Sequence, residues 1–307
     1  KLYKGDCLIE SDKIESGSVD LILTDLPYGT VKGMGGDMEK YKHLSNADWD
    51  NVIDTNKIMQ IANRILRKNG KMVLTANQPF TTELISKAIP NVPHCYNMYW
   101  NKMHFANCLV ANKAPVSYIE DVLVFSKNED TEKAHPLREY FYTEYEKTGL
   151  TYKEINRDYL ETTFEGGGGM AYNMLCRTRL YFSMPTKDAY SRLQKTGYFN
   201  KLYEELKVED EAFKNKMKST FNLWEGKKYK SNILKYKKDY TGHHPTQKPV
   251  LLLEDLIKTF SNENDLVVDL TMGSGSTGVA CKNTNRDFVG IEMNDEYYHI
   301  ACKRVGL

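Results

Sequence analysis

Apolar residues recur along this chain in two spacings, and each spacing predicts a different element. Short apolar runs rich in β-branched residues, at 19–24 and 266–269, predict buried strands. Between about residues 49 and 66, apolar side chains fall three and four apart, which predicts a helix closed by the pair Asn69-Gly70. Strands and helices of this kind alternate at both ends of the chain, so we expect a parallel or mostly parallel sheet.

The pattern divides the chain into three parts. Further strands are predicted at 2–3, 71–75, 97–100, 121–125 and 288–291, and further helices at 81–88, at 249–260 and from about 277. Between residues 127 and 243 this alternation gives way to charged helical patterns, many tyrosines and four consecutive glycines. We therefore expect an α/β domain made of residues 1–126 and 244–307, interrupted by an inserted helical domain over residues 127–243.

Composition places the chain among folded proteins. Of its 307 residues 41% are hydrophobic and 27% are charged, a balance that disfavours disorder. No apolar run reaches membrane-spanning length and the start resembles no signal peptide, so we expect a cytoplasmic protein without a membrane partner. The six cysteines are scattered with no C-x-x-C pair, and we therefore expect neither a metal site nor a disulfide framework.

Charge is informative only locally. The net charge of +1 indicates nothing about nucleic acid, but six lysines and two tyrosines crowd residues 227–238. Clustered cations suit a phosphate backbone, which makes Lys227, Lys228 and Lys230 candidate DNA contacts. A solvated lysine-rich surface is the alternative interpretation.

A glycine turn follows the strand at 266–269. Gly273, Gly275 and Gly278 fit the pattern G-x-G-x-x-G, and Glu292 ends the next strand, where an acid that binds ribose hydroxyls would lie. A tight strand-to-helix turn without a ligand would need glycines too. NAD fits the pattern as well, but its pyrophosphate would be repelled by the acid at the strand end, Asp269, which favours S-adenosylmethionine.

The tetrapeptide Asp25-Leu26-Pro27-Tyr28 ends the buried strand at 19–24. The exocyclic amine of a DNA base is a weak nucleophile, because its lone pair is delocalised into the ring. A carboxylate at Asp25 and a carbonyl at Leu26 can accept both of its hydrogens and disfavour that planarity, while Pro27 fixes the turn and Tyr28 offers a face for stacking. An ordinary strand-ending turn is the alternative.

Together these motifs resemble the DNA amino-methyltransferases of the permuted order called the β class. Asp25-Leu26-Pro27-Tyr28 resembles the family's Asp-Pro-Pro-Tyr, and the segment from His244 to Gly278 resembles its cofactor motifs. The resemblance covers both α/β parts. It implies a Rossmann-like methyltransferase sheet, with the catalytic half first and the cofactor half last, and an inserted, mainly α-helical target-recognition domain.

The resemblance also assigns roles to residues. It implies that Asp25, Leu26, Pro27 and Tyr28 are catalytic, and that S-adenosylmethionine is bound by Asp6, Cys7, His244, Thr246, Lys248, Asp269, Thr271, Gly273, Ser274, Gly275, Ser276, Thr277, Glu292 and Met293. Two positions depart from the family: Leu26 replaces its first proline, and Thr271-Met272 replaces its usual Pro-Phe. Aspartate rather than serine at position 25 favours adenine N6 over cytosine N4.

The insertion contains a candidate DNA reader. Thr151 and Glu154 form a capping-box pattern that opens a helix to about Leu160, and a second short helix is predicted at 170–176. The pair resembles a helix-turn-helix, although an ordinary helical packing unit fits equally well. The DNA-facing candidates are Tyr172, Asn173, Arg177 and Arg179.

The sequence thus predicts a DNA methyltransferase that acts on adenine N6 of a flipped base in double-stranded DNA, with S-adenosylmethionine as methyl donor. A cytosine-N4 methyltransferase, an NAD-dependent oxidoreductase and a DNA-binding protein with a degenerate site are the alternatives. Many members of the resembled family are homodimers, and the sequence leaves that state open. It also leaves open the DNA site that is recognised and the existence of a restriction partner.

Overall fold

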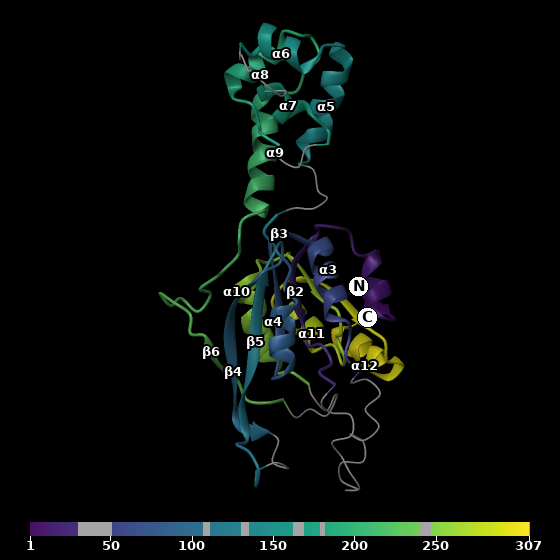
Figure 1. The fold of residues 1–307 in the computed structure, drawn as a ribbon, viewed down its shortest axis with the longest axis vertical. Helices are drawn as coiled ribbons and strands as arrows, with labels where there is room; N and C mark the ends of the chain where they lie inside the picture. Colours follow the sequence, from purple (N-terminus) through teal and green to yellow (C-terminus); the bar gives the residue numbers. More distant parts are fainter. Residues whose placement is uncertain are drawn as a thin grey trace. The chain divides into compact units, whose positions relative to one another are not determined.

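The computed structural model describes residues 1–29, 51–106, 111–129, 135–161, 169–178, 182–239 and 247–306. The chain divides into two compact units (Figure 1): one comprises Lys1–Glu129 with Ser219–Leu307, and the other comprises Asp130–Lys218. None of the helices in the described ranges is long and apolar enough to cross a membrane.

The first unit is built on an eight-stranded sheet, with the strands in the order β1-β8-β7-β2-β3-β5-β4-β6. β5 is antiparallel to β3 and β4, and the remaining neighbours are parallel, as the alternating pattern predicted. The strands are β1 (Leu2–Lys4), β2 (Val19–Thr24), β3 (Leu66–Ala76), β4 (His94–Ala106), β5 (Ser117–Ser126), β6 (Ile233–Lys235), β7 (Leu266–Asp269) and β8 (Asp287–Glu292).

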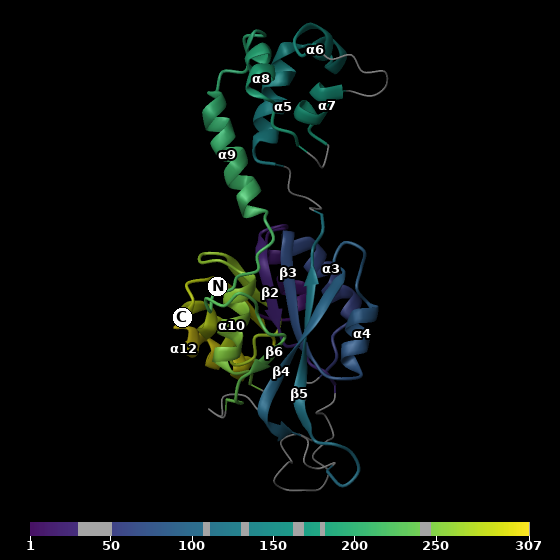
Figure 2. The same cartoon turned by 90° about the vertical axis from the view of Figure 1, so that its left-hand side faces the viewer.

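Helices cover both faces of this sheet. Figure 2 shows α3 (Thr55–Ile65) and α4 (Phe80–Ser86) on one side and α10 (Val250–Phe260) on the other. The central strand β2 is buried on both faces: Ile22 packs into the core under α3 and α4, and Leu21 and Leu23 pack into the core under α10 and α11. The remaining helices of the unit are α1 (Cys7–Glu10), a 3-10 turn at Ser11–Lys13, α11 (Ser276–Asn283) and α12 (Asp295–Val305).

β2 and β7 are neighbours although 241 residues of chain lie between Thr24 and Leu266 in sequence (266 − 24 − 1). Leu21 lies opposite Val267, and Ile22 lies opposite Val268, in parallel register. The carboxyl ends of the two strands therefore meet at one edge of the sheet, where α/β folds bind their ligands. This confirms that the tetrapeptide after β2 and the glycine turn after β7 belong to one place.

One local prediction was wrong. The pair Asn69-Gly70 does not close a helix: α3 ends at Ile65 and the chain passes directly into β3, where Asn69 takes a left-handed φ of 64°. Asn69 lies in an irregularity of β3: Val19 of β2 pairs with Leu66 and Leu21 pairs with Lys71, so the register shifts between these two pairs.

β6 was not predicted, because its polar flanks hide a three-residue strand. It pairs with β4, and its Leu234 packs in the same core cluster as Trp100. As a result, the residues from Ser219 onward belong to the unit that contains the sheet, and the helical unit ends at Lys218 rather than at residue 243.

The second unit is helical, as the insertion was predicted to be. It contains α5 (Leu137–Thr148), α6 (Tyr152–Asp158), α7 (Gly169–Leu175), α8 (Lys187–Gln194) and α9 (Tyr203–Lys216), and its core gathers aromatic side chains such as Phe141, Tyr190 and Phe199. The capping box of α6 is confirmed: Thr151 Oγ1 accepts from the Glu154 backbone at 3.3 Å, and Glu154 Oε2 accepts from the Thr151 backbone at 2.7 Å.

Candidate active site

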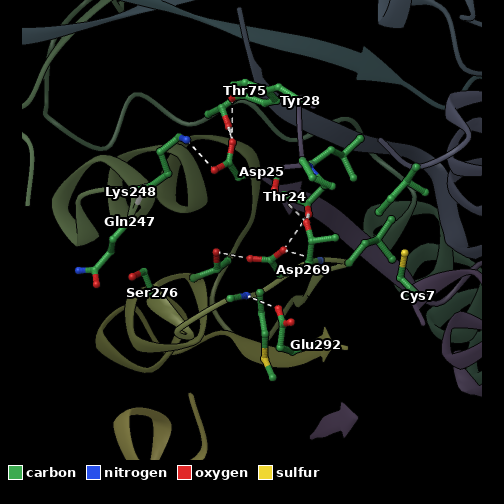
Figure 3. A pocket seen from close by; sticks show the side chains of 18 of the residues that line it. Cys7, Thr24, Asp25, Tyr28, Thr75, Gln247, Lys248, Asp269, Ser276 and Glu292 are labelled. Carbon is green, nitrogen blue, oxygen red and sulfur yellow. Dashed lines mark hydrogen bonds and ion pairs between the residues drawn. The ribbon is translucent and has the colours of Figure 1, made fainter. Parts of the chain in front are cut away.

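A cavity of about 1310 Å³ opens at the carboxyl ends of the central strands. Its walls include both the tetrapeptide that begins at Asp25 and the glycine turn that contains Gly273 (Figure 3). Glu292, at the end of β8, and Asp6, just after β1, line it as well. The parallel strands β1, β2, β3, β7 and β8 contribute residues at or just beyond their carboxyl ends, as expected for a site built on parallel strands, whereas the antiparallel β5 contributes residues of its amino end.

Two threonine hydroxyls connect the two halves of the cavity. Thr24 Oγ1 donates to Asp269 Oδ1 at 2.7 Å, and Thr271 Oγ1 donates to the backbone oxygen of Asp25 at 3.0 Å. The two hydroxyl oxygens also lie 2.9 Å apart, within hydrogen-bond distance. Thr271 stands where the resembled family has proline, so in this chain the threonine supplies a bond to the segment at Asp25 that a proline cannot make.

The Asp25 carboxylate is surrounded by donors from three different elements. Oδ1 accepts from Thr75 Oγ1 at 2.5 Å and from the Tyr28 hydroxyl at 2.8 Å. Oδ2 accepts from Lys248 Nζ at 2.6 Å, and Figure 3 shows this lysine reaching toward the carboxylate. The acid that sequence reasoning singled out is therefore held in place by β3, by its own turn and by the segment before α10.

A second carboxylate, Glu120 of β5, joins the same network. Its Oε1 lies 3.0 Å from Lys248 Nζ and accepts from the Tyr28 hydroxyl at 3.1 Å, and its Oε2 lies 3.3 Å from Lys102 Nζ. Burial raises the pKa of Glu120, but the two lysines outweigh burial and hold its pKa below the usual range. Burial likewise lowers the pKa of Lys248, and the carboxylates of Asp25 and Glu120 outweigh it, so that the lysine stays charged.

Tyr28 is fixed by contacts on its ring and its hydroxyl. The ring lies against Phe80, with centroids 5.5 Å apart, and Lys248 Nζ stands 5.7 Å from the ring centroid. Burial, followed by the charges of Asp25 and Glu120, raises the pKa of Tyr28 well above its usual value. The phenol therefore stays protonated and acts as a donor to these carboxylates.

Asp269 is anchored inside the fold. It is buried and accepts from Thr24, from Thr277 Oγ1 at 2.6 Å and from the Thr271 backbone at 3.1 Å. Burial raises the pKa of Asp269 to about 6, although the threonine hydrogen bonds act in the opposite direction. Thr277 was predicted to contact S-adenosylmethionine, but its hydroxyl donates to the Asp269 carboxylate.

The glycine turn is shaped by packing as much as by access. Gly273 and Gly275 have left-handed φ values of 50° and 81°, and a Cβ on Gly275 would lie 2.9 Å from that of Ala301. The Gly273 backbone donates to Glu292 Oε2 at 2.9 Å, and the Asn294 backbone donates to Oε1 at 2.7 Å. Burial raises the pKa of Glu292, while these backbone bonds lower it.

The charges around the glycine turn suit a cationic ligand. The acids Asp6, Asp269, Glu292 and Asp295, which lie at or just after β1, β7 and β8, line the cavity here. The lining lysines Lys102, Lys238 and Lys248 share the cavity with Glu120 and Asp25 on the other side. S-adenosylmethionine carries a sulfonium and an ammonium, so the residues present fit it, whereas the pyrophosphate of NAD would meet several carboxylates.

The remaining residues that were predicted to bind S-adenosylmethionine fall into three groups. Cys7 is buried in the cavity wall, where burial, followed by the Asp6 charge, raises the pKa of its thiol to about 12, and Met293 lies exposed at the rim. Ser274 and Ser276 both accept from Arg304. His244 and Thr246 lie outside the described residues, as does Arg179.

The polar residues of the site that sequence reasoning missed include Thr75, Lys102 and Glu120. Each lies on β3, β4 or β5, and no local motif marks it. Only Thr75 has a sequence signal, since it lies near the end of a predicted strand. Lys248 was assigned to the donor, but its ion pairs are with Asp25 and Glu120. No group of three or more potential metal ligands occurs within the described ranges.

Of the three lysines predicted to contact DNA, Lys230 is not free to do so. Its Nζ lies 2.5 Å from Asp255 Oδ1 and its side chain is only 7% exposed, so it cannot reach a phosphate. The charge of Asp255 inside the fold explains why a lysine is buried there. Lys227, 2.5 Å from Glu225, and Lys228 are exposed.

In the helical unit the predicted DNA-facing residues differ in exposure. Tyr172 is half-buried, with its ring 5.4 Å from that of Tyr152, and Asn173 is half-buried beside it. Arg177 is exposed and lies over the Tyr142 ring at 5.4 Å. Residues 159–168 separate α6 from α7, which is longer than the three- or four-residue turn of a helix-turn-helix.

Comparison with known proteins shows the family of this chain. A family model described as DNA methylase matches residues 19–303. DNA adenine methyltransferase YhdJ of Escherichia coli is 27% identical over 307 residues, 99% of this chain and 82% of that protein. Type II methyltransferase M.HindIII of Haemophilus influenzae is 24% identical over 341 residues, 100% of this chain and 95% of that protein. The crystal structure of the M1.HpyAVI-SAM complex shares the fold, with a TM-score of 0.54 at 19% identity over 100% of this chain and 99% of that one.

Proposed function

This chain belongs to the DNA methylase family, and on that premise we propose that it transfers a methyl group from S-adenosylmethionine to N6 of an adenine turned out of duplex DNA. The observation that carries the proposal is the pair of threonine bonds that join Asp25 to the glycine turn across β2 and β7. They hold the two halves of the site in one cavity, where a methyl donor and an amine can meet.

The acids beside the glycine turn hold the donor. S-adenosylmethionine supplies an electrophilic methyl group on a positively charged sulfur. Glu292 ends β8 with both oxygens already oriented by backbone donors, and each oxygen keeps a lone pair for a ribose hydroxyl. Asp6, at the start of α1, and Asp269 supply the negative charge that complements a cationic ligand.

The segment at Asp25 holds the base. The Asp25 carboxylate and the Leu26 carbonyl accept hydrogen bonds from the two N–H groups of the amine. The lone pair of the amine nitrogen then points toward S-adenosylmethionine. Tyr28, supported from behind by Phe80, offers its face to the base, a contact worth about 1–3 kcal/mol. No residue needs to form a covalent bond to the base, because alignment of the two reactants supplies most of the rate.

Adenine is the preferred target because position 25 is an aspartate. The name of the Escherichia coli relative, an adenine methyltransferase, supports this choice. Cytosine presents the same arrangement of an amine beside a ring nitrogen, so cytosine N4 is the competing target. Nucleoside analysis of the methylated product separates the two.

DNA is the macromolecular substrate, and we propose that the helical unit reads it. Arg177 and the neighbouring Tyr172 and Asn173 supply the contacts of this unit, and the exposed Lys227 and Lys228 contribute contacts to phosphates. The resemblance to type II methyltransferases such as M.HindIII makes a cognate restriction enzyme a further expectation.

The decisive experiment is expression in a host that lacks DNA methylation, followed by sequencing of the host DNA for modified bases. We expect N6-methyladenine in one recurring sequence context. The Asp25→Ala variant should leave the DNA unmodified while binding S-adenosylmethionine in calorimetry as the wild type does. Absence of any modified base from DNA exposed to folded, donor-binding wild-type protein would overturn the proposal.

A further inference from the structure

We propose that Lys248 is a positioning residue with two places: it occupies Asp25 while the base site is empty, and it shifts onto Glu120 when the target amine arrives. The inference rests on the proposed function and concerns how the same site admits its base. It assigns a role to a lysine and a glutamate that the sequence motifs did not connect.

The first observation is that Asp25 has no oxygen left without a donor. Thr75 and Tyr28 both lie on Oδ1, while Lys248 lies on Oδ2 at 2.6 Å. Both lone pairs of Oδ1 are therefore taken, whereas Oδ2 has one donor, so a base amine that binds the Asp25 carboxylate competes with Lys248 for Oδ2. The ammonium of Lys248 is the group that stands at the second oxygen.

The second observation is that Lys248 is the donor best able to move. Thr75 is a buried residue of β3, and Tyr28 is held against Phe80. A lysine ammonium is a compact charge on a flexible four-carbon stem, so a rotation in the side chain moves it without moving the backbone. Its Nζ is already 3.0 Å from Glu120 Oε1, so the shift requires a short displacement only.

The third observation is that Glu120 is prepared to receive it. The carboxylate is buried, with a side chain 7% exposed, and already lies near Lys102. Tyr28 has a single hydroxyl hydrogen to share between Asp25 and Glu120. When Lys248 moves onto Glu120, that hydrogen goes to Asp25. Lys248 and Glu120 keep a charged partner during the exchange, and Asp25 keeps its two hydroxyl donors while the amine replaces the ammonium, so no charge is left without a hydrogen-bond partner, which would be costly.

The exchange gives the site a chemical preference. A base with an amine at the reacting position donates a hydrogen bond to Asp25 in place of the one from Lys248. A base with a carbonyl at that position, such as thymine, offers no hydrogen, and Lys248 remains on Asp25. The lysine thus favours amino bases before any chemistry takes place.

A double-mutant cycle tests the exchange. Glu120→Gln removes the charge that receives Lys248 and preserves the shape of the side chain. We expect it to lower kcat/KM for duplex DNA about tenfold or more, the effect of losing one charged hydrogen bond. In the Lys248→Met background the same substitution should change kcat/KM less than about twofold, because no lysine has to be displaced.

Lys102→Met is the matched control. Among the described residues, the carboxylate that pairs with Lys102 is Glu120, at 3.3 Å, so removing this lysine does not uncover Asp25. In the Lys102→Met background, Glu120→Gln should therefore still lower kcat/KM for duplex DNA about tenfold. Calorimetric binding of S-adenosylmethionine should be unchanged in every variant, which verifies that each one folds.

Two results would overturn the exchange: an equal loss from Glu120→Gln in both backgrounds, or no loss from Glu120→Gln in the wild-type background. The first would make Glu120 a direct or structural support of the base, and the second would show that Lys248 does not need Glu120 as a second partner. A failure of the proposed function looks different, because the wild type itself would then methylate no base.

Discussion

The Thr24 hydroxyl donates to Oδ1 of Asp269 at 2.7 Å, and this bond joins the last residue of β2 to the last residue of β7. It lies inside the fold, where Thr24 is 3% exposed and Asp269 is equally buried. A hydrogen bond to a buried carboxylate is worth more than one at the surface, since no water replaces it when it is lost. The bond therefore couples the position of the base site to that of the donor site.

Replacing this threonine should weaken both stability and donor binding. Thr24→Val keeps the shape but removes one donor of the buried Asp269, which should cost about 1–3 kcal/mol in the free energy of unfolding. Urea unfolding measures the loss, and calorimetry measures the weaker binding of S-adenosylmethionine. Thr82→Val on the exposed face of α4 is the control and should be neutral; equal losses in the two variants would contradict the coupling.

Asp269 should make the stability of the protein fall between acidic and neutral pH. Burial raises the pKa of this carboxyl in the folded state to about 6, above its usual value of 3.8, so the folded protein binds the proton more tightly than the unfolded chain. Its contribution is therefore complete below pH 3.8 and is lost as pH rises through about 6. The shift corresponds to roughly 3 kcal/mol at most.

Urea unfolding between pH 3.5 and pH 7.5 checks this sign. The Asp269→Asn variant should show a flatter profile over that window, with Glu292 contributing a remaining part in the same direction. Asp54→Asn is a control of opposite sign, because hydrogen bonds from Asn56 lower the pKa of this exposed helix cap. An unchanged pH profile in Asp269→Asn would refute the assignment.

Tyr28 should contribute through its ring and, separately, through its hydroxyl. Tyr28→Ala removes the stacking face and should raise KM for DNA by about ten- to a hundredfold, the equivalent of about 1–3 kcal/mol. Tyr28→Phe keeps the face and should affect KM much less, while kcat falls because Asp25 loses a donor that holds it in place. Steady-state kinetics distinguishes the two, and equal KM effects would contradict a stacking role.

Two lysines of the segment 227–238 should have different roles: Lys230 should stabilise the fold, and Lys228 should contact DNA phosphates. Lys230→Ala leaves Asp255 buried without its cation and should destabilise the fold by about 3–5 kcal/mol. Lys228→Ala should leave stability unchanged and reduce the slope of log affinity against log salt for DNA by about one. Urea unfolding and binding titrations over a range of salt measure the two effects; an unchanged salt slope in Lys228→Ala would remove it from the DNA interface.

Elements with a strong local pattern could be predicted from the sequence. The strand at 266–269 was predicted with its observed bounds, because three apolar residues are followed by an acid and a glycine turn. The cap of α6 was equally readable, since Thr151 and Glu154 satisfy each other within one turn. Asn69-Gly70 misled the prediction because the left-handed conformation that asparagine and glycine favour serves a strand irregularity as well as a helix end.

By itself the sequence determined the α/β character of the chain, the strand ends that carry Asp25 and Asp269, and the DNA methylase motifs, because each depends on residues close together in the chain. Only the tertiary structure decided that β2 lies beside β7, that Lys230 is buried on Asp255, and that Lys248 reaches Asp25 together with Glu120. Strand neighbours and ion pairs join residues tens to hundreds of positions apart. Their choice depends on how the whole core packs, and no local spacing records it.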